Sequence, residues 1–224
     1  MNEGISLWTG IRLCMPIIAL TFDDGPNTVV TPQVLDLLEE HGILASFFLI
    51  AQNITPESAE VVRRAKAMGC DIENHTLTHP FMDKMSVEEI RKEVDPCTEK
   101  IIEITGEAPK FFRPPFIAVN KAMYDNIDMT FICGAGCEDW VPTVTAEQRA
   151  ERVLAGAEDG QIVLLHDMQW NQFTVDALKT IIPELKKRGY EFVTVTQLFE
   201  RKNVTPQRGW LYSNALQTVS DNRL

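Results

Sequence analysis

The sequence predicts an α/β fold in which helices cover one parallel β-sheet. Apolar, strand-like runs alternate with helix-like runs along the 224 residues, and seven such repeats follow one another without a linker. The strand-like runs are continuously apolar, which is typical of strands buried on both faces. This pattern indicates one domain, 1–224, whose sheet is either closed into a barrel or open and doubly wound.

Seven segments are candidates for the strands of this sheet. They are residues 17–22, 45–50, 70–75, 110–113, 129–134, 162–167 and 191–196. No glycine-rich dinucleotide loop follows the first segment, which weakens a nucleotide-binding interpretation. We expect the residues from about 201 onward, which include Trp210 and Tyr212, to be a packed extension of the same domain.

The helices are predicted from their start and stop signals. The segments are 31–42, 55–69, 86–106, 145–160 and 174–189. The first two begin with Thr-Pro and end at Gly, as helices commonly do. Two others begin with capping boxes, Ser86 with Glu89 and Thr145 with Gln148. Pro96 is expected to kink or split the third segment.

The overall charge narrows the classes of partner. A formal net charge of -11 argues against nucleic acid, because phosphate binding needs a basic face. It gives no support for adhesion to an anionic membrane, and no apolar run is long enough to span a bilayer. We therefore expect a neutral or weakly charged substrate and no membrane insertion. We also expect a monomer.

The N-terminus and the cysteines bear on the compartment. The first 20 residues lack a basic region followed by an uninterrupted apolar core, so no signal peptide is expected. The chain is then either cytoplasmic or the trimmed mature part of an exported protein. Five cysteines, an odd number in a chain of this length, argue against a disulfide framework. Cys133 and Cys137 are expected to be buried thiols, because no second cysteine pair completes a zinc site.

Ionisable residues follow the ends of several predicted strands, where parallel α/β folds place their chemistry. His75 and His79 are four residues apart, a spacing that places both rings on one face of a helical turn. With a carboxylate from the first strand, they form the two-histidine, one-carboxylate set of zinc hydrolases. Cobalt and nickel would also suit these ligands.

Asp23 and Asp24 stand side by side after the first strand, where two buried like charges need compensation. One of them can bind the metal while the other serves as a base. Arg113, after the fourth strand, is a candidate to hold the base ionised. His166, after the sixth, is a candidate general acid whose pKa Asp139 can raise.

Five motifs resemble those of the polysaccharide deacetylase family, also called the NodB-homology family or carbohydrate esterase family four. They are TFDDGP, HTLTH, RPPF, EDW and LLHD, in this order, within residues 17–199. Together they are highly specific, although each is common alone. The resemblance implies a distorted, incomplete (β/α) barrel with about seven parallel strands. It also implies metal-dependent removal of acetyl groups from sugars.

The resemblance assigns roles residue by residue. Asp23 matches the catalytic base and Asp24 the metal-binding aspartate, while His75 and His79 match the metal-binding histidines. Arg113 matches the arginine that orients the base.

Further roles follow from the later motifs. Asp139 matches the carboxylate that tunes the acid, and His166 matches that acid. The backbone N–H near Phe116 would help to hold the oxyanion. Trp140 and Leu164 match apolar walls of the pocket for the acetyl methyl group.

The chain departs from the family pattern at two positions. Gly136 stands where many members have an Asp three residues before Asp139, and Ile117 stands where many have Gly after RPPF. The loop that carries the oxyanion N–H is therefore expected to differ. The sequences around RPPF, EDW and the last strand resemble the acetylxylan esterase branch most. This resemblance implies O-acetylated xylan as the substrate and an extracellular place of action.

Three other functions stay open from the sequence. One is an N-deacetylase of chitooligosaccharides or peptidoglycan. A second is a magnesium phosphatase, which the histidine ligands disfavour. A third is a noncatalytic glycan-binding homologue, for which Trp170 and Phe173 offer aromatic faces to sugar rings. Trp170 is a candidate for binding the glycan both in an enzyme and in a noncatalytic homologue.

Overall fold

The computed structural model describes residues 15–218. The strands are β1 (Ile17–Asp23), β2 (Ser46–Leu49), β3 (Asp71–Asn74), β4 (Phe111–Phe112), β5 (Thr130–Ile132), β6 (Ala135–Gly136), β7 (Ile162–His166), β8 (Glu191–Phe192) and β9 (Leu211–Tyr212). The helices are α1 (Val30–His41), α2 (Pro56–Met68), α3 (Val87–Thr105), α4 (Lys121–Asn126), α5 (Ala146–Gly156), α6 (Gln172–Lys187) and α7 (Val195–Lys202), with short 3-10 turns η1 (Ala51–Asn53) and η2 (Pro115–Ile117). Residues 1–14, on which the expected absence of a signal peptide partly rests, lie outside the described part.

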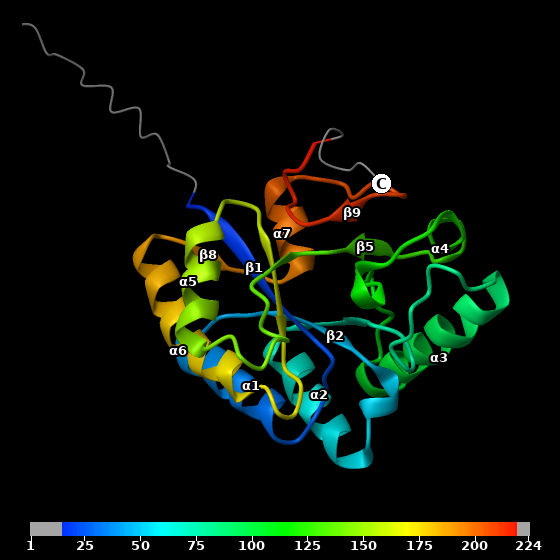
Figure 1. Ribbon diagram of the computed structural model, residues 1–224, viewed down its shortest axis with the longest axis horizontal. Coiled ribbons are helices and arrows are strands. Elements are labelled where there is room, and N and C mark those ends of the chain that lie inside the picture. Colours follow the sequence, from blue (N-terminus) through cyan, green and yellow to red (C-terminus); the bar gives the residue numbers. More distant parts are fainter. Residues whose placement is uncertain (1–14, 219–224) are drawn as a thin grey trace, which may run out of the picture.

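The strands form one curled sheet in the order β6-β7-β1-β2-β3-β4-β5-β9, and β8 pairs with the start of β1. Every pairing between these strands is parallel. Only residues 133 and 134 separate β5 from β6, yet the two strands lie near opposite ends of this order. The sheet must therefore curl back on itself (Figure 1). The predicted incomplete (β/α) barrel is confirmed.

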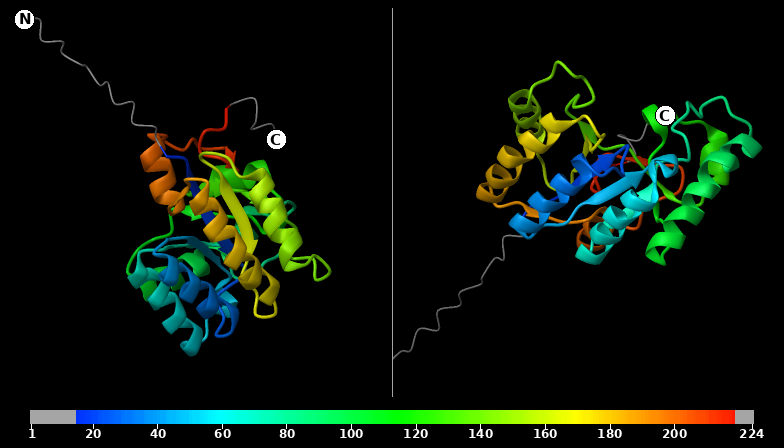
Figure 2. Two further views of the ribbon diagram at one scale, coloured as in Figure 1. Left: turned by 90° about the vertical axis from the view of Figure 1, so that its left-hand side faces the viewer. Right: turned by 90° about the horizontal axis from the view of Figure 1, so that it is seen from below.

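Helices cover the outer face of the sheet as a continuous layer. Neighbouring helices contact each other in the order α5, α6, α1, α2, α3 and α4 (Figures 1 and 2). Both faces of β1 are buried, as its apolar run predicts: Ile18 and Phe22 pack into the cluster beneath this helical layer, whereas Ile17 and Ala19 pack into a second cluster on the other face. No helix between residues 15 and 218 is long and apolar enough to cross a membrane.

The structure departs from the sequence-based prediction in several elements. All seven predicted strand segments contain a strand, but the short strands β6 and β9 were not predicted. The expected extension contributes β9, which pairs with β5. The last predicted strand stops at Phe192, because Thr194 caps helix α7 through the N–H of Gln197. Helix α3 runs unbroken through Pro96, so the expected split is wrong.

Candidate active site

The predicted site residues meet at the carboxyl edge of the sheet. Asp23, the last residue of β1, lies in register with Phe48 of β2 and with His166 at the end of β7. His75 directly follows β3, and Arg113 directly follows β4. Parallel pairing therefore brings motifs that are far apart in the sequence to one place.

Asp24, His75 and His79 form a three-residue cluster that could hold a metal ion. One ligand atom from each residue lies within 4.8 Å of the other two. Asp24 Oδ1 lies 3.5 Å from the Nε2 atom of each histidine. This oxygen is buried and accepts no hydrogen bond from residues 15–218. A buried oxygen without a donor, beside two imidazole nitrogens, fits a divalent cation such as zinc.

The two histidines come together through a loop, so the helical turn expected from their spacing is wrong. Residues 75–80 are not helical, and Thr76 and His79 have positive φ values of 73° and 62°. Thr76 Oγ1 accepts a hydrogen bond from the His79 N–H at 2.9 Å, which closes the turn. His75 Nδ1 lies 2.6 Å from the Arg113 carbonyl oxygen. That contact turns Nε2 toward Asp24, as second-sphere partners of metal ligands do.

Asp23 is paired with Arg113 and is not part of the three-residue cluster. Its Oδ1 accepts a hydrogen bond from Arg113 Nη1 at 2.5 Å, and both side chains are almost fully buried. Its Oδ2 lies 3.6 Å from His75 Nε2. The Arg113 guanidinium also lies over the Phe48 ring, 4.1 Å from its centroid. The buried arginine therefore fixes the position and orientation of this carboxylate.

His166 is paired with Asp139, as the sequence led us to expect. Its Nδ1 lies 2.8 Å from Asp139 Oδ1, and its backbone N–H donates to Asp139 Oδ2. Burial opposes the charged imidazolium, but the hydrogen bond and charge of Asp139 outweigh it and raise the pKa of His166 to about 9. The imidazole is thus held as a proton donor at neutral pH.

Three residues that the sequence did not single out hold Asp139 in place. Thr174 Oγ1 donates to Asp139 Oδ2 at 2.8 Å, and Asn171 Nδ2 approaches the same oxygen at 3.4 Å. Buried Arg149 in turn donates to Asn171 and to Thr174. Arg149 and Thr174 lie inside α5 and α6, where nothing in a sequence pattern points toward the barrel edge.

The remaining candidates line the rim of the site. Trp140 is exposed and its ring meets His166 edge-on, with centroids 5.5 Å apart. Leu164 is buried and, like Trp140, lies next to Gly136. A Cβ on Gly136 would lie 3.2 Å from the Trp140 ring and 3.8 Å from Leu164, so the missing side chain leaves room for this indole. Ile117 has a φ of 55°, which keeps the glycine-like turn after Phe116 despite its branched side chain.

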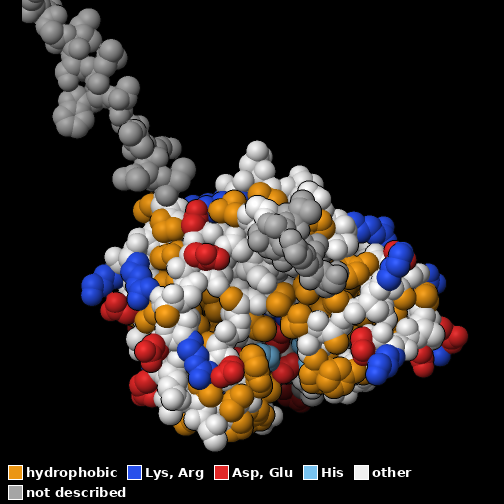
Figure 3. Space-filling model, turned by 45° about the horizontal axis from the view of Figure 1, so that its top comes forward, with side chains coloured by type: hydrophobic (Ala, Val, Ile, Leu, Met, Phe, Trp, Pro, Cys, Tyr) orange, Lys and Arg blue, Asp and Glu red, His pale blue; other side chains and the backbone are white. Residues whose placement is uncertain are grey.

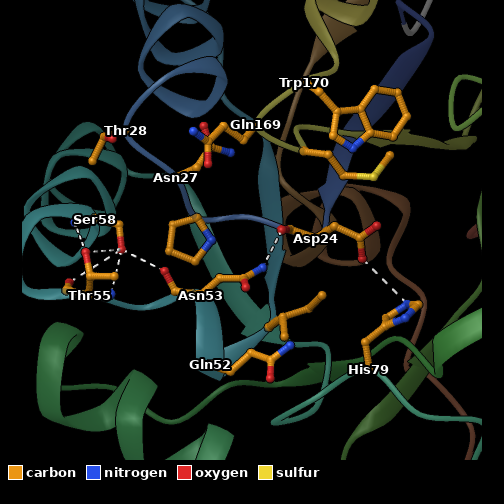
Figure 4. Close-up of a pocket in the computed structure, with 13 residues that line it drawn as sticks. Asp24, Asn27, Thr28, Gln52, Asn53, Thr55, Ser58, His79, Gln169 and Trp170 are labelled. Atoms are coloured by element: carbon orange, nitrogen blue, oxygen red, sulfur yellow. Dashed lines mark hydrogen bonds and ion pairs between the residues drawn. The ribbon is translucent and has the colours of Figure 1, made fainter. Parts of the chain in front are cut away.

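A pocket of about 480 Å³, lined by both polar and apolar side chains, opens beside the metal-ligand cluster. It is lined by Asp24, Pro26, Asn27, Thr28, Ile50, Gln52, Asn53, Thr55, Ser58, His79, Met168, Gln169 and Trp170. No Lys or Arg side chain of the described chain lines it. Figure 4 shows Asp24 and His79 adjacent, with Gln169 and Trp170 on one side of Asp24 and Gln52 on the other. Figure 3 shows histidine and acidic atoms in a hollow with hydrophobic side chains on either side.

The turn that carries Asp24 is packed against Asp167, a further residue that sequence reasoning did not single out. Thr31 Oγ1 donates to Asp167 Oδ2, and Asn27 donates to the Asp167 carbonyl oxygen. Burial raises the pKa of Asp167 to about 7. A Cβ on Gly25 would lie 2.7 Å from both carboxylate oxygens of Asp167. Gly25 is therefore required by this close approach, and its neighbour Asp24 depends on it.

We expect Gly25→Ala to displace the turn and to weaken metal binding by Asp24. The overpacking should lower the free energy of unfolding by about 1–3 kcal/mol. Urea unfolding and zinc titration of the metal-stripped protein measure the two effects. Gly156→Ala is the matched control, because a Cβ there meets nothing within 4 Å. Equal zinc affinity for wild type and Gly25→Ala would contradict the expectation.

Comparison with known proteins gives consistent matches. The family model described as "Polysaccharide deacetylase" matches residues 12–132. A bifunctional xylanase/deacetylase of Pseudobutyrivibrio xylanivorans is 50% identical over 190 residues, covering 85% of this chain and 31% of that protein. The peptidoglycan-N-acetylglucosamine deacetylase PgdA of Listeria monocytogenes is 38% identical over 186 residues, covering 83% of this chain and 39% of that protein. The chain thus spans less than half the length of either relative.

A solved structure shares the fold along its whole length. It is a family 4 acetyl xylan esterase from Clostridium thermocellum in complex with a cobalt ion, with 41% sequence identity and a TM-score of 0.87. The alignment covers 90% of this chain and 100% of that one. The likeness therefore includes the segments after residue 132, where Asp139 and His166 lie.

Proposed function

Since the chain belongs to the polysaccharide deacetylase family, we propose that it is a metal-dependent acetylxylan esterase that removes O-acetyl groups from xylan. The observation that carries the proposal is the convergence of a metal-ligand cluster, a carboxylate–arginine pair and a histidine–carboxylate pair at one sheet edge. The xylanase/deacetylase and the acetyl xylan esterase support the choice of xylan. Because polymeric xylan lies outside cells, the proposed place of action is extracellular.

Asp24, His75 and His79 are the proposed ligands of one divalent metal. Two imidazoles and one carboxylate suit zinc, and cobalt or nickel as alternatives. When bound, the ion supplies Lewis acidity to the reacting carbonyl and to water. The bond from His75 Nδ1 to the Arg113 carbonyl oxygen keeps the ligand nitrogen directed at this place.

The chain's own side chains supply the proton transfers. Asp23 is the proposed base that takes a proton from the attacking water, and its ion pair with Arg113 holds it in position. His166, kept protonated by Asp139, is the proposed acid that donates a proton to the leaving sugar oxygen. The backbone N–H of Phe116 is the proposed oxyanion donor. Trp140 and Leu164 are the proposed walls around the acetyl methyl group.

An N-deacetylase is the second candidate, favoured by the similarity to PgdA. The same base, acid and metal ligands serve for an amide, since the acid can protonate a leaving nitrogen as well as an oxygen. A purely glycan-binding role fits less well, because buried Asp23 and Asp139 are already arranged as parts of a complete proton-transfer set.

Acetate release by metal-stripped protein tests the proposal. Zinc, cobalt, nickel or magnesium is added back, and acetylated xylan is compared with an N-acetylglucosamine oligomer. We expect zinc or cobalt to restore release from xylan and magnesium to fail, because magnesium prefers oxygen ligands. Release from the amino-sugar oligomer alone would favour the N-deacetylase. Release from neither substrate, with metal bound, would overturn both.

A further inference from the structure

Most of the exposed aromatic side chains in residues 15–218 lie around the site. Phe81, Phe116, Trp140, Trp170 and Phe173 are the exposed aromatics among residues 15–218. Four of them lie beside site residues: Phe116 contacts His79 and stacks on Phe81, Trp140 contacts His166, and Trp170 lines the pocket, whereas Phe173 lies in α6. Isolated exposed hydrophobic residues need no explanation, but a gathering of large rings around a site indicates binding. Among these rings, Phe81 has no role in the proposed mechanism.

Phe81 and Phe116 form an aromatic pair beside the ligand His79. Their rings are parallel, with an interplanar angle of 11° and centroids 3.8 Å apart. Phe116 also meets the His79 ring edge-on at 4.6 Å. Phe81 remains 62% exposed and Phe116 54% exposed. Because Phe116 covers one face of Phe81, the exposed area of Phe81 lies on its other face and its edges.

Hydrogen bonds hold in place the loops that carry this pair. The exposure of the two rings is therefore not a result of loop flexibility. Glu93 accepts hydrogen bonds from the N–H and the hydroxyl of Thr78, both at 2.8 Å. Asn120, after the Phe116 turn, donates to the Asp83 carbonyl oxygen at 2.7 Å and so ties the two loops together. Met82, next to Phe81, is fully buried. The backbone thus anchors Met82 inside and presents Phe81 outside.

The aromatic pair lies outside the pocket that opens beside the metal-ligand cluster. His79 lines that pocket and contacts Phe116, so it separates the two surfaces. Neither Phe81 nor Phe116 lines the pocket. A substrate chain that places one acetyl group at the metal-ligand cluster can therefore extend over the aromatic pair in one direction and toward Trp170 in the other.

We propose that Phe81 and Phe116 form a stacking surface for an uncharged pyranose ring of the glycan, next to the sugar that carries the acetyl group. This inference rests on the proposed function and names the part of the polymer that the site recognises. The apolar C–H face of a pyranose matches a flat aromatic ring, and its hydroxyls stay in water at the edges. The acidic net charge favours an uncharged ring over an anionic one.

The test compares Phe81→Ala with the conservative Phe81→Trp on a long and a short substrate. On acetylated xylan we expect Phe81→Ala to raise KM about tenfold, because roughly half of one side chain's burial is lost, with little change in kcat. On 4-nitrophenyl acetate, which has no neighbouring sugar ring to stack on Phe81, the two variants and wild type should be equal. Phe81→Trp should retain the wild-type KM. Ile102→Ala removes an exposed apolar side chain on α3 and is the matched control.

Binding without turnover separates this inference from the proposed function. Unacetylated xylohexaose and chitohexaose are titrated into wild type and Phe81→Ala, and we expect about tenfold weaker binding of at least one of them by the variant. That loss would support the stacking surface even if acetate is never released. Equal affinities of wild type and variant for both oligomers, absence of binding by wild type, or equal loss on 4-nitrophenyl acetate would overturn it.

Discussion

Asp23→Asn is expected to lower kcat on acetylated glycan by about 10²- to 10⁴-fold, the usual contribution of a positioned general base. The amide keeps the size of the side chain but cannot accept a proton from water. Asp23 lies outside the cluster of Asp24, His75 and His79, so zinc binding should persist. Steady-state acetate release and zinc titration on the same sample measure both properties.

Asp24→Asn is the matched variant for this prediction. It lies one residue away and should lose zinc affinity together with activity, because its carboxylate is the proposed ligand. Asp23→Asn also leaves the buried Arg113 without its charged partner, so a lower melting temperature is expected. Activity is therefore compared well below that temperature. Wild-type turnover by Asp23→Asn would remove Asp23 from the role of base.

Asp139→Asn is expected to move the alkaline limit of activity to lower pH. A general acid works while it is protonated, so kcat/KM should hold below the pKa of His166 and fall as the pH rises through it. Asp139 raises that pKa to about 9, against a value near 6.5 for an unperturbed histidine. If the variant returns to that ordinary value, the protonated fraction at pH 8 falls roughly 30-fold.

The pH profile of kcat/KM for wild type, Asp139→Asn and His166→Ala measures this effect. A divalent ion beside Asp24 lowers the pH of the alkaline limit in both wild type and Asp139→Asn, so the difference between these two proteins is the decisive quantity. The kcat/KM of His166→Ala should be about 10²- to 10⁴-fold lower than that of wild type at every pH, and it should show no fall at alkaline pH. Identical profiles for wild type and Asp139→Asn would mean that Asp139 does not tune His166.

The same pair makes stability depend on pH. The folded-state pKa of His166 is raised, so the pair stabilises the fold fully below the unfolded value near 6.5 and loses this contribution as the pH rises through about 9. Asp139→Asn should therefore flatten the dependence of the melting temperature on pH between these values.

The places of seven strands along the chain and their burial could be predicted well, whereas β6, β9 and α7 could not. Long apolar runs identify β1 and β7 because a strand buried on both faces must be apolar throughout. The two-residue strands β6 and β9 have no such pattern, since distant strands supply all their pairing partners. The β-forming residues at the start of helix α7 favoured a strand prediction. Only the capping box at Thr194 indicates that a helix begins there.

By itself, the sequence determined the fold class, the family and the residues that carry the proposed chemistry. Motifs at strand ends suffice for this, because parallel pairing forces those ends to one edge. Only the tertiary structure decided which groups touch. It divided the two aspartates between Arg113 and the histidines, replaced a helical turn by a loop at His79, and set Arg149 behind Asp139. Such contacts depend on the direction of the backbone and on partners that are distant in the sequence. A local sequence pattern contains neither.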